Sequence, residues 1–259
     1  HYFKLILNIS KPGNKAIILD SLLSDVFISL FNSTRPDFSN LFLNSGAHIQ
    51  HHYMFNSDAY KGSLKNPDWY CPKGFDPLLG ILKEYDNTLS RLLKIPNLKI
   101  IIATGLHQEA HEKLTFYWRL KDHDSFLNSI GLDYYSKVLP RMSRDFLINF
   151  KNNIETRNAE QFLESFIMKS DSLKIFNVDN RGDSLFVELV YPKDIIDSDC
   201  IISSKFNKEF PFFKKYISFV AIKNGEHDGI GYLTSNFKLK KSDQMDLIDL
   251  KDLIVSQCL

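Results

Sequence analysis

Hydrophobic and polar positions alternate with two different periods along this chain, and each period predicts a different kind of element. Apolar residues recur every three or four positions over residues 14–31, which predicts an amphipathic helix. Its apolar stripe comprises Ile18, Leu22, Val26 and Leu30, widened by Leu19, Leu23 and Phe27. Residues 76–93 predict a second long helix, because Asp76 is a good N-cap and Pro77 suits the first turn. Shorter helices are expected at residues 124–130, 158–168 and 245–255.

Short apolar runs between these helices predict strands. Residues 98–103, LKIIIA, are rich in β-branched side chains and apolar on both faces, which favours a central parallel strand. The run Leu41-Phe42-Leu43 also has the character of a buried strand. An antiparallel hairpin is expected late in the chain, where two runs flank a turn at residues 179–183. Further strands are expected at residues 114–120 and 216–222. The alternation predicts a single α/β domain, residues 1–259, on a mainly parallel sheet.

Composition narrows the possible functions. The 259 residues are 44% hydrophobic and 24% charged, with a formal net charge of +1, which gives no electrostatic reason to expect nucleic acid or an anionic membrane as partner. No apolar stretch suggests a transmembrane helix, and the three cysteines form no CxxC pair. We therefore expect a cytoplasmic protein. The first residues lack Met and the form of a signal peptide, so we expect the chain to begin inside a longer protein.

Histidines are concentrated just after the predicted strands. Three of the eight, His48, His51 and His52, lie within five residues of each other. His107 with His111, and His227 with Asp228, follow two further predicted strands. If these strands are parallel neighbours, the three junctions share one edge of the sheet, where α/β folds place their ligands. Imidazole with carboxylate is a usual ligand set for zinc. The alternative is that these histidines only cap strand ends and bond to loops.

The run from residue 41 to 53, the helix at 76–93 and the strand IIIATGLHQ resemble the alkaline phosphatase superfamily, which includes sulfatases and type I phosphodiesterases. The resemblance covers roughly residues 15–110 and 216–232. It implies a three-layer sandwich and a divalent metal, zinc or manganese, held by His51, His107 and His227. His48 and Asp228 are additional candidate ligands beside these positions, and His52 is a candidate general base.

The chain departs from the family pattern at several positions. Ala47 stands where the family has an Asp four residues before its first His, and Leu106 stands where it has the Asp of Asp-His. The family's N-terminal strand, with its nucleophile, has no counterpart. Three interpretations therefore stay open: a longer parent protein supplies the missing part, the site holds one metal or none, or the domain is a non-catalytic descendant.

Basic residues elsewhere are candidates for binding a substrate anion, since guanidinium groups match phosphate and sulfate oxygens. They are Lys121, Arg141 and Arg144, with surface or ion-paired roles as the alternative. The leading prediction is a metal-dependent hydrolase or transferase that acts on phosphoryl or sulfuryl esters of small molecules or glycans. The second prediction is a degenerate alkaline-phosphatase-like domain used for binding or structure.

Overall fold

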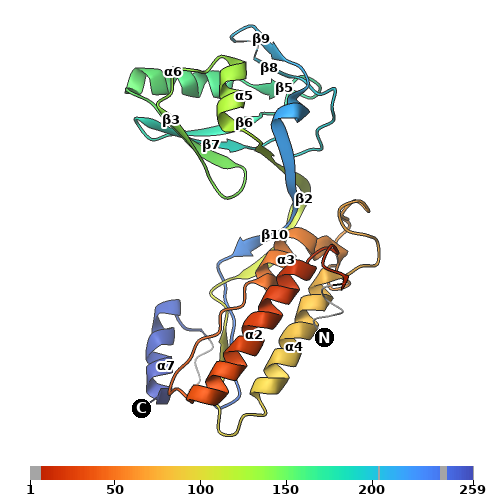
Figure 1. Cartoon of the computed structure of the whole chain (residues 1–259), viewed down its shortest axis with the longest axis vertical. Coiled ribbons are helices and arrows are strands. Elements are labelled where there is room, and N and C mark those ends of the chain that lie inside the picture. The colour runs from red at the N-terminus through yellow and green to blue at the C-terminus, as the bar shows by residue number, and fades with distance from the viewer. Residues whose placement is uncertain (1–6, 204, 240–243, 259) are drawn as a thin grey trace. The chain divides into compact units, whose positions relative to one another are not determined.

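The structure is a computed structural model that describes residues 7–203, 205–239 and 244–258. Backbone contacts divide the chain into two compact units (Figure 1). Unit 1 comprises His1–Lys113 and Asn224–Leu259, and unit 2 comprises Leu114–Lys223. Two long strands, β2 (His107–Leu120) and β10 (Ile217–Asp228), pair with each other, and each contributes residues to both units.

Unit 1 is built mainly from helices. Its two long helices, α2 (Asn14–Thr34) and α4 (Pro77–Leu92), lie side by side, and the shorter α3 (Ser45–Tyr53) packs against both (Figure 1). The remaining elements are η1 (Met54–Asn56), β1 (Ile101–Ala103), β11 (Leu233–Ser235), η3 (Leu247–Asp249) and α7 (Leu250–Cys258). Ile17, Ile49, Leu78 and Ile81 form the buried cluster where the three helices meet.

The start of α4 follows its sequence signals. The Asp76 carboxylate accepts a hydrogen bond from the Leu79 amide at 2.9 Å, and Pro77 occupies the first turn. This arrangement satisfies one of the amides that have no partner within the helix. The predicted helix at residues 76–93 is therefore confirmed, and so is the helix predicted at residues 14–31.

Unit 2 is built around a four-stranded antiparallel sheet of order β3-β4-β7-β6. The strands are β3 (Lys137–Pro140), β4 (Asp145–Asn149), β6 (Phe176–Asn180) and β7 (Ser184–Leu189). The other elements are α5 (His123–Ile130), α6 (Asn153–Glu164), η2 (Phe213–Tyr216) and a sheet of β5 (Ile167–Met168), β8 (Ile201–Ser203) and β9 (Lys208–Phe210). The predicted hairpin is confirmed as β6 and β7, whose turn places Gly182 at a φ of 93°.

The predicted alkaline-phosphatase-like sandwich with a mainly parallel central sheet is wrong. Among the described residues, every strand pair with a defined register is antiparallel, and no sheet has more than four strands. The run at residues 98–103 yields only the three-residue β1, in which Ile102 is 42% exposed. Residues 41–43 form neither helix nor strand, and Phe42 is 75% exposed. A parallel strand needs cover on both faces, and neither run receives it.

Candidate metal centre

The first histidine cluster lies on a helix, not after a strand as predicted. All three residues, His48, His51 and His52, belong to α3. His48 and His52 are one turn apart and therefore share a side of the helix, where their rings meet edge to face with centroids 4.7 Å apart. Burial lowers the pKa of His48, which favours its neutral form. His51 points away from this pair toward β10.

His51 and His227 converge, although they lie 176 positions apart in the sequence. Their Nε2 atoms are 2.8 Å apart, and the Nδ1 atom of His51 is 3.0 Å from the Gly225 carbonyl oxygen. A carbonyl can only accept, so the His51 Nδ1 must carry the proton and donate. This hydrogen bond leaves the His51 Nε2 lone pair directed at His227. Metal-binding histidines are commonly oriented by such a bond to a backbone carbonyl.

A glycine allows α3 to come this close to β10. A Cβ atom on Gly225 would lie 2.6 Å from the Gln108 side-chain oxygen and 2.9 Å from the Gln50 carbonyl oxygen. A backbone contact that short cannot relax by rotating a side chain. The absence of a side chain at Gly225 is therefore what lets the His51 ring reach the strand that carries His227.

A buried amide network holds Asn224, the residue before Gly225 in β10. The Asn224 side-chain oxygen accepts from the Phe55 amide at 2.9 Å and from Asn66 at 2.8 Å, and its nitrogen donates to the Asn66 oxygen at 2.9 Å. Asn224 is fully buried, so these bonds offset the cost of removing its amide from water. The network links η1, and Asn66 in the segment that follows it, to β10. No sequence signal indicates this network, because Asn224-Gly225 has the character of a turn.

The other predicted ligands lie on the opposite face of the paired strands. His107 Nδ1 is 2.8 Å from the Ile230 carbonyl oxygen and 3.6 Å from the Asp228 carboxylate, while His111 is 3.7 Å from Glu226. Side chains alternate between the two faces of a strand, so Asp228 and His227 point in opposite directions. The Gln108 side chain faces α3 and donates a hydrogen bond to the Ala47 carbonyl oxygen at 3.2 Å. The side chain of the adjacent His107 therefore lies on the other face of β2.

This alternation divides the predicted ligand set. His51 and His227 form one pair on the α3 face, and His107 with Asp228 forms another on the far face. Within the described residues, no three His, Cys, Asp or Glu side chains are grouped to hold a metal ion. Sequence reasoning placed all of these residues at one sheet edge, because it assigned His107 and His227 to loops. Both residues lie within strands.

The predicted anion-binding residues belong to unit 2. The Lys121 ammonium donates to the Lys215 carbonyl at 3.1 Å, and Lys121 lines a cavity of about 450 Å³. The Arg144 guanidinium lies 4.3 Å from the Tyr117 ring centroid and 3.8 Å from Glu188. Arg141 is exposed. Their contacts are those of side chains packed on the surface of unit 2, and a role in substrate binding stays a prediction.

Comparisons with known proteins assign no class: neither a family model, nor a curated protein, nor a solved structure matches the chain. By length and composition alone, α2 is long and apolar enough to cross a membrane, contrary to the expectation that no stretch would be. The convergence of His51 and His227 is therefore the main functional feature of the described residues.

Proposed function

We propose that the chain binds a divalent metal, zinc or manganese, through His51 and His227, and acts as a hydrolase or transferase on phosphoryl or sulfuryl esters. The observation that carries this proposal is the convergence of the two rings, whose Nε2 atoms share a hydrogen bond of 2.8 Å in the metal-free chain. The sequence resemblance implies both residues as ligands, and nothing in their spacing along the chain would bring them together by itself.

The donor set suits a transition metal. Imidazole nitrogen is a preferred ligand of zinc. The His51 tautomer set by Gly225 leaves Nε2 unprotonated, where it accepts a hydrogen bond from the His227 Nε2–H, and a metal bound between the two atoms would displace that proton. Two protein ligands leave coordination positions open, as a catalytic site requires. A metal bound there would polarise a phosphoryl or sulfuryl oxygen and lower the pKa of a bound water. The chain's own contribution would be to hold both rings in place through Gly225 and the Asn224 network.

The second candidate is a binding or structural role without catalysis. The observation in its favour is the lack, among the described residues, of a third metal-ligating side chain beside the pair. Catalytic zinc sites usually have three protein ligands. Ala47 lies one helical turn before His51, on the same side of α3, at the position where the resembling family has its carboxylate.

Zinc titration with matched variants tests metal binding. Changing His51 or His227 to Ala should weaken zinc binding by about 100-fold or more, since each removes a ligand, and His111→Ala serves as the control. The control residue, His111, is a histidine of β2 that contacts Glu226 on the far face of the paired strands. Equal zinc binding by all four proteins would place the metal elsewhere. Gly225→Ala should also weaken binding, because it pushes α3 away from β10 while leaving both imidazoles in the sequence.

A gain-of-function variant sharpens the test. Ala47→Asp would place a carboxylate one turn from His51, and it should tighten zinc binding by about tenfold or more. Hydrolysis of generic phosphodiester and sulfate esters is then measured on each zinc-loaded protein. Activity lost in His51→Ala and His227→Ala supports the enzyme. Stoichiometric zinc without activity on any ester supports the non-catalytic role.

A further inference from the structure

The longest helix of unit 1 presents its apolar side to solvent. Five large aliphatic residues lie on one side of α2 and are 42–57% exposed: Leu19, Leu22, Leu23, Val26 and Leu30. This set, here called the outer face of α2, contains most of the stripe that the sequence predicted to face a core. A contiguous exposed apolar patch on a folded protein usually marks an interaction surface.

The opposite side of α2 is buried and carries polar residues beside Ile17 and Ile28. Asp20, Ser21 and Ser24 are each no more than 2% exposed. The Asp20 carboxylate accepts from the Ser45 amide at 3.0 Å and from the Tyr85 hydroxyl at 2.7 Å. These contacts fix the rotation of the helix, because turning the outer face inward would leave buried polar groups of α3 and α4 without partners.

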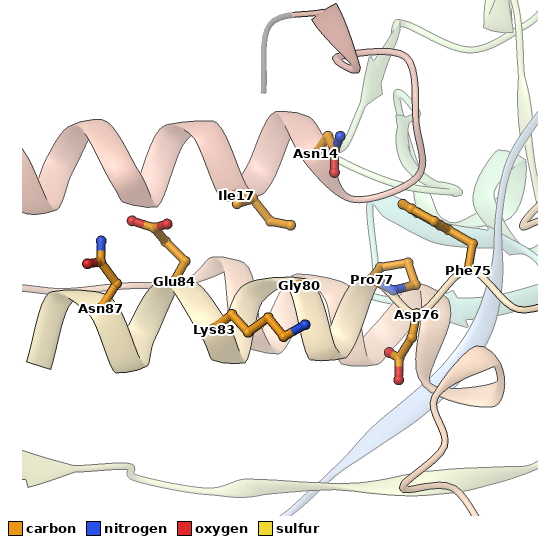
Figure 2. A pocket seen from close by; sticks show the side chains of 9 residues that line it. All are labelled: Asn14, Ile17, Phe75, Asp76, Pro77, Gly80, Lys83, Glu84 and Asn87. Carbon is orange, nitrogen blue, oxygen red and sulfur yellow. The ribbon is translucent and has the colours of Figure 1, made fainter. Parts of the chain in front are cut away.

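The contacts also show that α2 and α4 run parallel. Ile17 of α2 lies against Gly80 of α4, as Figure 2 shows, with the Gly80 Cβ position 3.1 Å from the Ile17 side chain. One turn further along both helices, the Ser21 hydroxyl donates to the Glu84 carboxylate at 2.7 Å. Arg91 near the end of α4 then pairs with Asp25. Contacts advance along both helices in the same direction.

Parallel neighbouring helices are common in α/β folds, where the crossover helices run in the same direction. In α/β folds, such helices form a layer that buries its apolar side on a sheet. The α4 helix also has exposed aliphatic residues, Leu79 at 45% and Leu82 at 52%. Within the described part of unit 1, the only sheet besides the β2–β10 pair is β1–β11, whose two strands have three residues each, too few to cover a 21-residue helix.

A lipid bilayer is a poor match for this surface. A helix that spans a membrane should carry no buried charged residue. A helix that lies on a membrane surface should have a polar side rich in Lys and Arg. The other side of α2 instead holds Asp20, and its partner helix contributes Glu84 and Arg91. Between Leu19 and Leu30 there is no basic residue to meet anionic headgroups.

We infer that the outer face of α2 is a docking surface for the apolar face of a β-sheet in a second polypeptide. Between Leu19 and Leu30 the only charged residues are Asp20 and Asp25. Asp20 is buried and accepts from the Tyr85 hydroxyl, and Asp25 pairs with Arg91 of α4. The outer face therefore suits a partner without charge at the contact. The inference is independent of the metal site, since it uses none of the histidines.

Site-specific photo-crosslinking in cells tests this inference. A photoreactive phenylalanine replaces Val26, at the centre of the outer face, and a control replaces Asn87, an exposed polar residue of α4. The expected result is one polypeptide crosslinked from position 26 and not from position 87, with the crosslink in a segment that alternates apolar and polar residues. That polypeptide is then purified, and its affinity for the chain should fall by about 30-fold or more in Val26→Lys.

Other occupants give different and decisive outcomes. A crosslinked second copy of the chain, with a dimer in sedimentation that Val26→Lys dissociates, would overturn the inference in favour of self-association. Flotation with phosphatidylcholine or phosphatidylglycerol vesicles that Val26→Lys abolishes would overturn it in favour of a membrane. A purified partner that binds Val26→Lys unchanged, or no crosslink at all, would also reject it. Val26 is exposed, so the variant should fold, and protection of the Cys71 thiol, which is fully buried in unit 1, checks that it does.

Discussion

The two units differ in which residues they bury. In unit 2, β7 alternates strictly between buried and partly buried positions, and the buried side chains face an aromatic core. The largest side chains of that core are Trp118, Phe126, Phe146, Phe166, Phe176 and Phe213. In unit 1, the longest helix buries Asp20 and exposes Leu19. Unit 2 therefore buries its largest apolar side chains within its own residues, whereas unit 1 leaves the outer face of α2 exposed.

Helix capping separates α2 and α3 from α4 of unit 1, which Asp76 caps, and from the helices of unit 2. In unit 2, the Asp122 carboxylate accepts from the Ser125 amide at 2.9 Å, and Asn152 accepts from the Ile154 and Glu155 amides at 3.0 Å. In unit 1, α2 and α3 have no side-chain cap. The helices of unit 2 are thus specified by neighbouring residues, while α2 and α3 depend on contacts made after the chain folds.

The largest predicted change in unfolding free energy comes from a buried residue of unit 2, compared with an exposed residue of unit 1. Phe146→Ala should lower the free energy of unfolding of unit 2 by about 3–5 kcal/mol, because Phe146 is fully buried in β4 and packs on His123. The matched control is Phe42→Ala in unit 1, where the ring is 75% exposed and the change should stay within about 0.5 kcal/mol. Guanidinium unfolding followed by Trp118 fluorescence measures the first, and circular dichroism the second. Similar losses for both variants would refute the contrast.

Much of unit 2 could be predicted from the sequence because its signals are local. The hairpin of β6 and β7 and the helix ended by Gly131 both follow from a few adjacent residues. The 14–31 helix was also predicted, but not which way it faces. An apolar stripe has the same spacing whether it meets a core or a partner, and the partners of Asp20 lie 25 and 65 positions away.

The candidate metal ligands could likewise be predicted from the sequence only in part. His51 and His227 were both predicted as ligands, and the structure brings them together. His107 was predicted beside them and lies on the other face, because the strand β2 begins at His107 itself and sets the alternation. A one-residue change of register reverses the face of every side chain, and the sequence did not fix that register.

The next prediction concerns the polar side of α2. Asp20→Ala should lower the free energy of unfolding of unit 1 by about 1–3 kcal/mol, because it leaves the buried Ser45 amide and the Tyr85 hydroxyl without their acceptor. Leu22→Ala on the outer face is the control and should change it by about 0.5 kcal/mol or less. Chemical denaturation followed by circular dichroism gives both values. If the leucine variant is the more destabilised, the outer face is not open in solution.

The smallest effect depends on pH and reports on unit 1 alone. Burial, with a smaller contribution from the nearby Asp76 charge, raises the pKa of the Cys71 thiol to about 12. The protonated thiol is therefore favoured in the folded protein, and its contribution to stability is complete below the ordinary thiol pKa. That contribution is lost as pH rises from about 9, the ordinary value, through about 12. Cys258 is exposed and serves as the internal reference for labelling.

Thiol labelling at pH 8 and pH 10 measures this effect. Cys258 should react with an aromatic disulfide reagent at once, and Cys71 only when unit 1 opens, since the thiolate is the reactive form and Cys71 is fully buried. In a denaturant series, Cys71 should become reactive at a lower concentration than that at which Trp118 fluorescence changes, because α2 keeps its apolar side in water. The gap should widen at pH 10. If Cys71 and Trp118 respond together at both pH values, the two units unfold as one, and the outer face costs unit 1 no stability.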